Sequence, residues 1–284
     1  MDAQPAPAPY RHPLNRRHLL GLAVGGAAAV LSGCSTVLTG STGSTGGVGS
    51  RSSGGASCVP RSSMDSHRTL AGLPLVYEIG RRRSSFDFEP DFYGQLEGWL
   101  TSYADVSGLA APDQVWTYGA WTNGGGSCDS WHNAGRAFDL ARLRLRGGAF
   151  VSCRYDLWKS ETGRGLDRSL RQYWALAASL HLHFAYVLTY LYNARHHNHI
   201  HVDNSRSGAG RSTLSTRSPT QVQAVQAICT HLWDEPVEIT GRWDDATRDA
   251  TRRVLERAGQ GGDLDDDVQS WRAFLTASVP RGGD

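Results

Sequence analysis

Residues 130–139 read SWHNAGRAFD, and this stretch places one His and one Asp seven positions apart. If His132 and Asp139 bind one metal ion, their donor atoms must lie within roughly 3–4 Å of each other. On a regular helix these positions are about 10 Å apart along the axis, and on an unbroken strand they face opposite sides. We therefore expect the chain to turn at Gly135, which tolerates such a backbone. Asp139 then lies near the start of a strand over residues 137–145.

A second cluster follows later in the chain, where residues 196–203 read HHNHIHVD. It comes after the aromatic and β-branched stretch 184–192, which predicts a buried strand. His199 and His201 are two positions apart, so on a strand both point to one face. The two clusters together supply nitrogen and oxygen ligands of the kind that a catalytic zinc takes. They predict a Zn²⁺ site and hydrolysis by a metal-activated water.

Apolar periodicity around these clusters indicates the fold class. Residues 90–104 and 167–180 carry apolar side chains at helical spacing, and residues 115–118 predict a strand. Helices followed by strands in this order predict an α+β fold, with a small antiparallel sheet and flanking helices around the zinc site.

The first cluster also carries a family resemblance. Its pattern S-x-H-x-x-G-x-A-x-D, from Ser130 to Asp139, resembles the signature of the D-alanyl-D-alanine carboxypeptidase-like zinc metallopeptidases. The downstream segment is closer still to the extensin-like C-terminal branch of that group, on the positions Tyr192, Asn193, His196, His199, His201 and Asp203. The resemblance covers about residues 60–205. It implies a hydrolase that cuts peptide bonds of peptidoglycan.

The resemblance also implies roles for single residues. Carried over, the zinc ligands are His132, Asp139 and His201, and His199 handles the proton. We expect the substrate pocket and its surroundings to include Ser130, Trp131, Arg136, His196 and Tyr118.

Two positions depart from the family pattern. Many relatives have a Glu three residues before the last His; here that residue is Asn198, so the base would be His199. Many also carry a Tyr-Arg pair that binds the substrate carboxylate, whereas residues 118–121 read YGAW. These departures favour an endopeptidase over a carboxypeptidase, with Arg136 and Arg195 as possible substitutes.

The last part of the chain predicts three helices. They cover residues 219–231, a helix that Asp244 or Asp245 caps, and residues 268–275. The pattern G-x-W-D-x-x-T at 241–247 resembles the signature of a small three-helix peptidoglycan-binding domain. We thus expect a catalytic domain over 59–212 and a binding domain over 213–284. The alternative is a helical extension packed on the catalytic domain.

The N-terminus predicts export. Arg16 and Arg17 resemble a twin-arginine signal, and the apolar stretch 21–31 is too short for an ordinary membrane span. Residues 31–34 resemble a lipobox with Cys34 as the lipidated residue, and the alternative is a plain secretory signal. We expect a signal over 1–34, a Ser/Gly-rich tether over 35–58 and a location in the bacterial cell envelope.

Four cysteines remain besides Cys34, which in an exported chain suggests two disulfides with three possible connectivities. We favour Cys128–Cys153, which would hold the metal loop against the sheet, and then Cys58–Cys229.

The formal net charge is only +2, and no clustered basic face indicates nucleic acid. The expected partners are peptidoglycan and, through the lipid anchor only, a membrane; the sequence gives no signal of oligomeric state. Two functions follow: an active zinc peptidase, or a catalytically inactive peptidoglycan-binding lipoprotein with the same fold.

Overall fold

The computed structural model describes residues 58–123, 128–204 and 212–283. The predicted signal, the lipidation at Cys34 and all of the tether up to residue 57 lie outside these residues. The described residues belong to one compact unit. Within the described ranges, no helix combines the length and the apolar character needed to cross a membrane.

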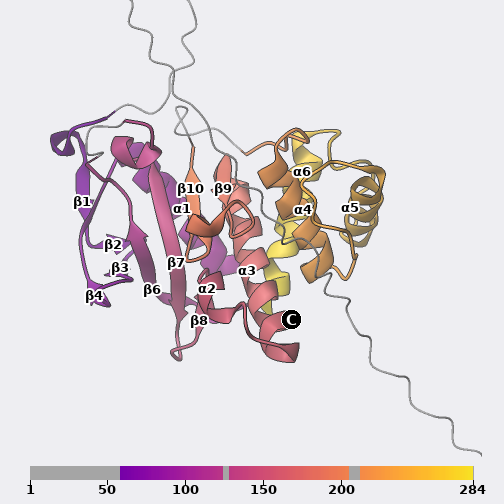
Figure 1. Cartoon of the computed structure of the whole chain (residues 1–284), viewed down its shortest axis with the longest axis horizontal. Coiled ribbons are helices and arrows are strands. Elements are labelled where there is room, and N and C mark those ends of the chain that lie inside the picture. Colours follow the sequence, from indigo (N-terminus) through magenta and orange to yellow (C-terminus); the bar gives the residue numbers. More distant parts are fainter. Residues whose placement is uncertain (1–57, 124–127, 205–211, 284) are drawn as a thin grey trace, which may run out of the picture. The chain divides into compact units, whose positions relative to one another are not determined.

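The main sheet of the described residues has eight strands, and its path runs β2-β3-β6-β7-β10-β9 (Figure 1). Strand β4 pairs with β3, and β8 pairs with β7. The bounds are β2 Thr69–Leu70, β3 Leu73–Tyr77, β4 Arg82–Arg83, β6 Pro112–Gly119, β7 Ala137–Leu145, β8 Phe150–Ser152, β9 Tyr186–Leu188 and β10 Ile200–Asp203. Strands β1 (Asp65–His67) and β5 (Phe86–Phe88) form a separate two-stranded sheet.

The α+β class is confirmed, and the strand expected over residues 137–145 is β7 with the same bounds. One pair departs from an antiparallel sheet, because β3 and β6 run parallel. Helix α1 (Pro90–Val106) lies between them in the chain, and a parallel pair requires a crossover connection of this kind.

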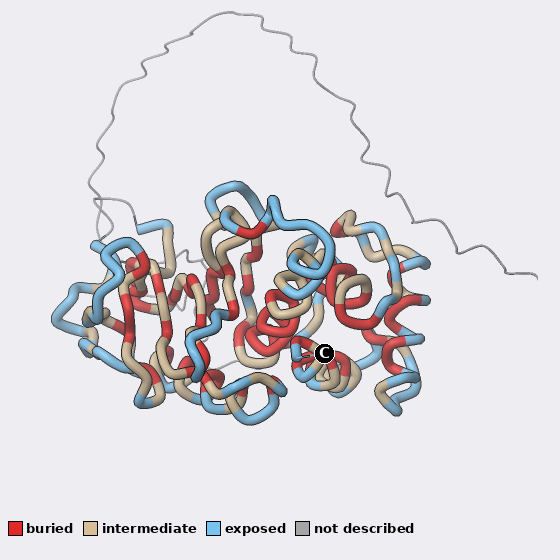
Figure 2. The backbone as a smooth tube through the Cα atoms, turned by 90° about the horizontal axis from the view of Figure 1, so that it is seen from below, coloured by how far each residue is buried: buried red, intermediate tan, exposed pale blue. Residues whose placement is uncertain are grey.

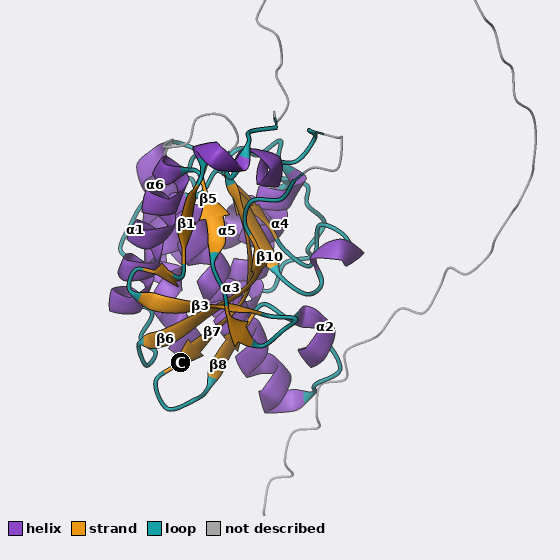
Figure 3. Ribbon diagram, turned by 90° about the vertical axis from the view of Figure 1, so that its left-hand side faces the viewer, coloured by secondary structure: helices purple, strands orange, loops and turns teal. Residues whose placement is uncertain are grey.

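The helices cover one side of the sheet and enclose the core. Helix α3 (Gly163–His183) packs against α1 and against strands β8 and β9, and the short α2 (Tyr155–Trp158) precedes it. In Figure 3 most of the helices lie behind the strands. Figure 2 shows the buried segments in the interior of the molecule and exposed segments around them. The sheet edge that carries β10 and β9 is thereby fixed on a rigid interior.

Three helices follow near the C-terminus, as expected. They are α4 (Pro219–Leu232), α5 (Asp245–Arg257) and α6 (Val268–Ser278). Helix α3 packs against both α4 and α6, so these helices share buried side chains with the rest of the unit. Their predicted role in binding peptidoglycan stays a prediction.

The G-x-W-D-x-x-T pattern has a structural role in this region. Asp244 is the N-cap of α5, and its Oδ1 accepts hydrogen bonds from the backbone N–H and the hydroxyl of Thr247, at 2.9 and 2.6 Å. The fully buried Gln226 on α4 donates to the Thr247 hydroxyl at 2.9 Å and accepts from the Gly241 N–H at 2.9 Å. The pattern therefore fixes where α5 begins against α4.

The strand expected over residues 184–192 is wrong in its extent. Phe184 is the C-cap of α3, and only Tyr186–Leu188 pair as β9. Beyond the strand, the Tyr192 N–H donates to the Thr189 carbonyl at 3.0 Å and closes a turn. The Tyr190 ring stacks on Tyr155 with centroids 4.1 Å apart. The aromatic residues thus form a packed cluster where the sequence pattern predicted a continuous strand.

The expected disulfides Cys128–Cys153 and Cys58–Cys229 are also wrong. Cys58 pairs with Cys128, and Cys153 and Cys229 are buried free thiols. The reason is that β8 pairs with the C-terminal half of β7. The Cys153 N–H therefore donates a hydrogen bond to the Ala141 carbonyl, away from the metal loop.

The first described residues lie along that loop instead. The Val59 N–H donates to the Asn133 carbonyl at 2.9 Å, and the Trp121 indole donates to the Val59 carbonyl at 3.0 Å. The segment that contains Cys58 is therefore the one that holds the metal loop.

This pairing can be checked by peptide mapping. Digestion without reduction should give a cross-linked peptide that contains Cys58 and Cys128. Burial raises the pKa of the Cys153 and Cys229 thiols, so both should react with an alkylating reagent only after denaturation. A cross-linked Cys128–Cys153 peptide would contradict the structure.

Candidate metal centre

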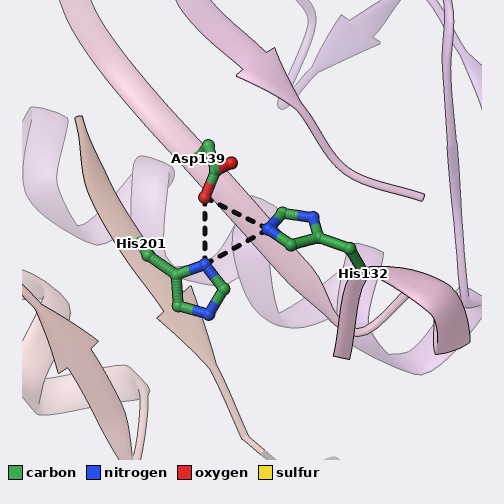
Figure 4. Close-up of side chains that lie close together, drawn as sticks. All are labelled: His132, Asp139 and His201. Atoms are coloured by element: carbon green, nitrogen blue, oxygen red, sulfur yellow. Dashed lines mark hydrogen bonds and ion pairs between the residues drawn. The ribbon is translucent and has the colours of Figure 1, made fainter. Parts of the chain in front are cut away.

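Three donor side chains converge where β7, β10 and a short 3₁₀ turn meet. Asp139 lies on β7, and His201 lies directly opposite it on β10. His132 lies in the turn η2 (Trp131–Ala134), which precedes β7. Figure 4 shows the three side chains pointing toward one another from these elements. The predicted ligands, far apart in sequence, thus share one site.

The separations of the donor atoms suit a single metal ion. His132 Nε2 lies 3.2 Å from both Asp139 Oδ1 and His201 Nδ1. His201 Nδ1 lies 2.9 Å from the same Asp139 oxygen. Ligands about 2.0 Å from a tetrahedral zinc would be roughly 3.3 Å apart. These three residues are therefore close enough to hold a metal ion.

The backbone around Gly135 brings His132 to the strand, as predicted. Gly135 has φ of +67° and its N–H donates to the His132 carbonyl at 3.1 Å. A Cβ at this position would lie 2.8 Å from the Glu89 amide nitrogen and would also meet the Met64 sulfur. The left-handed backbone alone costs a side-chain-bearing residue about 1–2 kcal/mol, so glycine is required here. Ser130 caps the turn, with its hydroxyl accepting from the His132 N–H at 3.3 Å.

Each histidine ligand has a second partner that fixes which nitrogen faces the metal position. The His132 Nδ1–H donates a hydrogen bond to the Ala120 carbonyl at 2.5 Å, which leaves the Nε2 lone pair to bind a metal. The His201 Nε2–H donates to Asp203 Oδ2 at 3.0 Å, which leaves Nδ1. Such outer partners orient metal-binding imidazoles and raise their basicity.

Electrostatics keeps the carboxylate ionised and His201 basic. Burial raises the pKa of Asp139, but the nearby rings of His132, His201 and His199 hold that pKa well below its usual range. Burial lowers the pKa of His201, yet its hydrogen bonds to Asp139 and Asp203 outweigh burial and raise the pKa to about 9. Before metal binding, both ring nitrogens of His201 therefore carry a proton at neutral pH.

His199 lies beside the three donors. Its Nε2 is 3.3 Å from Asp139 Oδ1, and its Nδ1–H donates to Asn198 Oδ1 at 2.6 Å. The Tyr118 hydroxyl is hydrogen-bonded to the Asn198 side chain in turn. Burial, together with the nearby His201 and His132, lowers the pKa of His199 although Asp139 opposes the shift. His199 is thus neutral at pH 7, with the Nε2 lone pair toward the metal position.

A cavity of about 490 Å³ opens on this group. Besides the donors and His199, it is lined by Asp129, Ser130, Trp131, Leu188, Tyr192, Arg195, His196 and Asp203. Burial, then His199 and His201, lower the pKa of His196 to about 4, so its ring is neutral. Its Nδ1–H donates to Asn193 Oδ1 at 2.8 Å.

Two predicted residues lie outside this cavity lining. Tyr118 reaches the site through Asn198 and through its ring, whose centroid lies 5.9 Å from that of His199. Arg136 lies 3.5 Å from the Glu89 carboxylate and is not among the residues that line the cavity.

The sequence prediction named Asp203 and Asn198 but assigned neither a role as a partner of the site, and it did not name the Ala120 carbonyl. The role of Asp203 could have been predicted, because it lies two positions after His201 on a strand and so shares its face. No local sequence pattern indicates the contact of His132 with the Ala120 carbonyl, since that contact depends on how the loop after β6 folds.

Comparison with known proteins supports one part of the predicted resemblance. The family model for the extensin-like protein C-terminus matches residues 119–213. This segment contains the three donors, His199 and Asp203. No curated protein and no solved structure matches the chain. The carboxypeptidase-like part of the resemblance stays a prediction.

Loss of the outer partner of His201 should weaken metal binding. We expect Asp203→Ala to lower zinc affinity by roughly 10–100-fold, because the ring loses its orientation and basicity. Asp203→Asn keeps an acceptor for the Nε2–H and should lose less. Competition with a chelating dye measures both, and equal affinity of Asp203→Ala and the unchanged protein would contradict this arrangement.

Zinc affinity should also rise with pH. The pKa of His201 is raised to about 9 in the metal-free protein, so a metal that binds at Nδ1 must displace a proton. Between pH 6.5 and 8.5, affinity should increase by roughly tenfold per pH unit and then level off above about 9. The same dye competition measures this dependence, and a flat profile below pH 8.5 would refute it.

Proposed function

We propose that this chain is an exported zinc metallopeptidase that hydrolyses peptide bonds of peptidoglycan, and that it acts as an endopeptidase. One observation carries the proposal. His132 Nε2, Asp139 Oδ1 and His201 Nδ1 lie within 3.2 Å of one another and line an open cavity, with His199 beside them. Three protein ligands with an open fourth side are the arrangement of catalytic rather than structural zinc sites.

The donor set suits zinc in particular. Two imidazoles and one carboxylate, in a partly buried site, are ligands that zinc takes readily, whereas Ca²⁺ and Mg²⁺ prefer oxygen donors. A zinc ion held by these residues would lower the pKa of a coordinated water toward about 7 and would polarise a substrate carbonyl.

His199 is the proposed general base. Its Nε2 lies next to the three metal-binding side chains. This nitrogen carries a lone pair, because the ring proton is on Nδ1 and is donated in a hydrogen bond to Asn198 Oδ1. Its lowered pKa keeps it neutral and ready to accept a proton from the attacking water. The protonated ring then donates that proton to the leaving amine. Tyr118 and Asn198 hold the ring in the orientation that this transfer needs.

This arrangement accounts for Asn198 where many relatives have a Glu. An amide oxygen cannot take up a proton at neutral pH as a carboxylate can, but it accepts the His199 Nδ1–H at 2.6 Å. Asn198 is therefore a positioning residue, and the chemistry passes to His199.

The choice of an endopeptidase rests on residues 118–121, which read YGAW and lack the Arg that binds the substrate carboxylate in many relatives. Arg136 is held by Glu89 outside the cavity, so it is not placed to bind the carboxylate of a chain end. Arg195 lines the cavity and is exposed. If the enzyme were a carboxypeptidase, Arg195 is the residue that would bind the terminal carboxylate.

Export of the protein and its lipid anchor at Cys34 are part of the same proposal. The Cys58–Cys128 disulfide supports it, because disulfides persist in oxidising compartments such as the periplasm and the cell surface. The bacterial cell envelope is also where the proposed substrate is found.

Digestion of purified peptidoglycan, read by mass spectrometry, tests the function. The zinc-loaded protein should release new peptide fragments. His199→Ala should lower the rate by roughly 10²–10⁴-fold, the usual contribution of a general base, while it keeps its zinc. His197→Ala is the matched control, since His197 belongs to the same run but does not line the cavity; it should stay active.

The outcomes separate the two functions. Zinc-loaded protein that binds peptidoglycan without releasing fragments would favour the inactive binding lipoprotein. Full activity of His199→Ala would show that another group takes the proton.

A further inference from the structure

A second cavity lies at strand β9. It has a volume of about 260 Å³ and is lined by Ala185, Tyr186, Thr213, Ser215, Ser218 and Gln221. It is smaller than the roughly 300–1,000 Å³ of typical ligand pockets. Its size therefore suits a small ligand or a single unit of a larger one.

Strand β9 connects the two cavities. Leu188 lines the metal cavity and Tyr186 lines the second one. The two residues are two positions apart on one strand, so their side chains share a face about 7 Å apart. On β10, the residue paired with Leu188 is His201 and the residue paired with Tyr186 is Asp203. A ligand that fills the second cavity therefore lies beside the metal centre.

The lining has the chemistry of a saccharide site. None of the described residues that line it is charged, and four of them carry hydroxyl groups. Tyr186 is 51% exposed, although it is a large aromatic residue on a strand. A sugar ring presents hydroxyl groups at its edge and an apolar C–H face. Exposed tyrosine rings offer an apolar surface for such a face and a polar tip.

The cavity wall is held in place before any ligand binds. The Gln221 side chain donates to the Thr213 carbonyl at 3.0 Å and accepts from the Ser215 N–H at 2.7 Å. The Ala185 N–H donates to Asn204 Oδ1 at 2.7 Å, which fixes the chain just before Tyr186. A preorganised wall lowers the entropy cost of binding.

We infer that this cavity binds a neutral saccharide unit, with the sugar ring on Tyr186 and its hydroxyl groups bonded to Thr213, Ser215 and Ser218. The further step rests on the proposed function: the saccharide is part of the substrate, and its binding places an attached peptide in the metal cavity. The enzyme then recognises a peptide joined to glycan in preference to a free peptide.

The test is titration of the metal-free protein with the trimer of N-acetylglucosamine, followed by NMR or calorimetry. Saturable binding is expected, and Tyr186→Ala should weaken it by roughly tenfold or more. Tyr186→Phe keeps the ring and should retain most of the affinity. Thr213→Val, which removes one exposed hydroxyl, should weaken binding by a smaller factor. Leu157→Ala is the control, because Leu157 is 55% exposed but lines neither cavity.

The results distinguish this inference from the proposed function, because the titration needs no metal and no hydrolysis. Trimer binding that depends on Tyr186, in a protein that cuts no peptidoglycan, would support the saccharide site and refute the peptidase. Hydrolysis without trimer binding would overturn the saccharide site. A synthetic sugar-free peptide that binds in a Tyr186-dependent way, when the trimer does not, would also overturn it.

Discussion

The pairing of β7 with β10 is the constraint on which the site depends. Their register sets Asp139 directly opposite His201, and non-covalent pairing of two strands must hold these donors within about 3 Å. A slip by one residue would move His201 to the other face of the sheet and remove it from the site. Buried residues on the opposite face, such as Phe138, Leu140 and Ile200, hold the strands in register. The apolar core therefore determines where the polar donors meet.

The donors would still be useless to a metal without a second layer of hydrogen bonds. The Ala120 carbonyl and the Asp203 carboxylate each accept a hydrogen bond from the ring N–H that faces away from the site. Asn198 does the same for His199. Three imidazoles thus turn a nitrogen toward one point, where water or substrate can be held. Strand β10 also pairs with β9, which carries Tyr186, so neighbouring strands serve both the metal centre and the proposed saccharide site.

The sequence predicted what local pattern and spacing control. The glycine turn, the strand that carries Asp139 and the Asp244 cap all follow from rules that involve neighbouring residues, and the structure confirms them. The disulfide and the extent of β9 depend on contacts between distant segments. Cys58 reaches Cys128 because the start of the described chain packs along the metal loop. Tyr190 leaves the strand because its ring packs on Tyr155.

The central claim is that His132, Asp139 and His201 form a zinc site. Zinc content after equilibrium dialysis, measured for the unchanged protein and for His132→Ala, tests it most directly. The account predicts stoichiometric zinc in the unchanged protein and a large loss in the variant, with the fold of both checked by circular dichroism. A folded protein that takes up no zinc, or a variant that keeps it in full, would contradict the account.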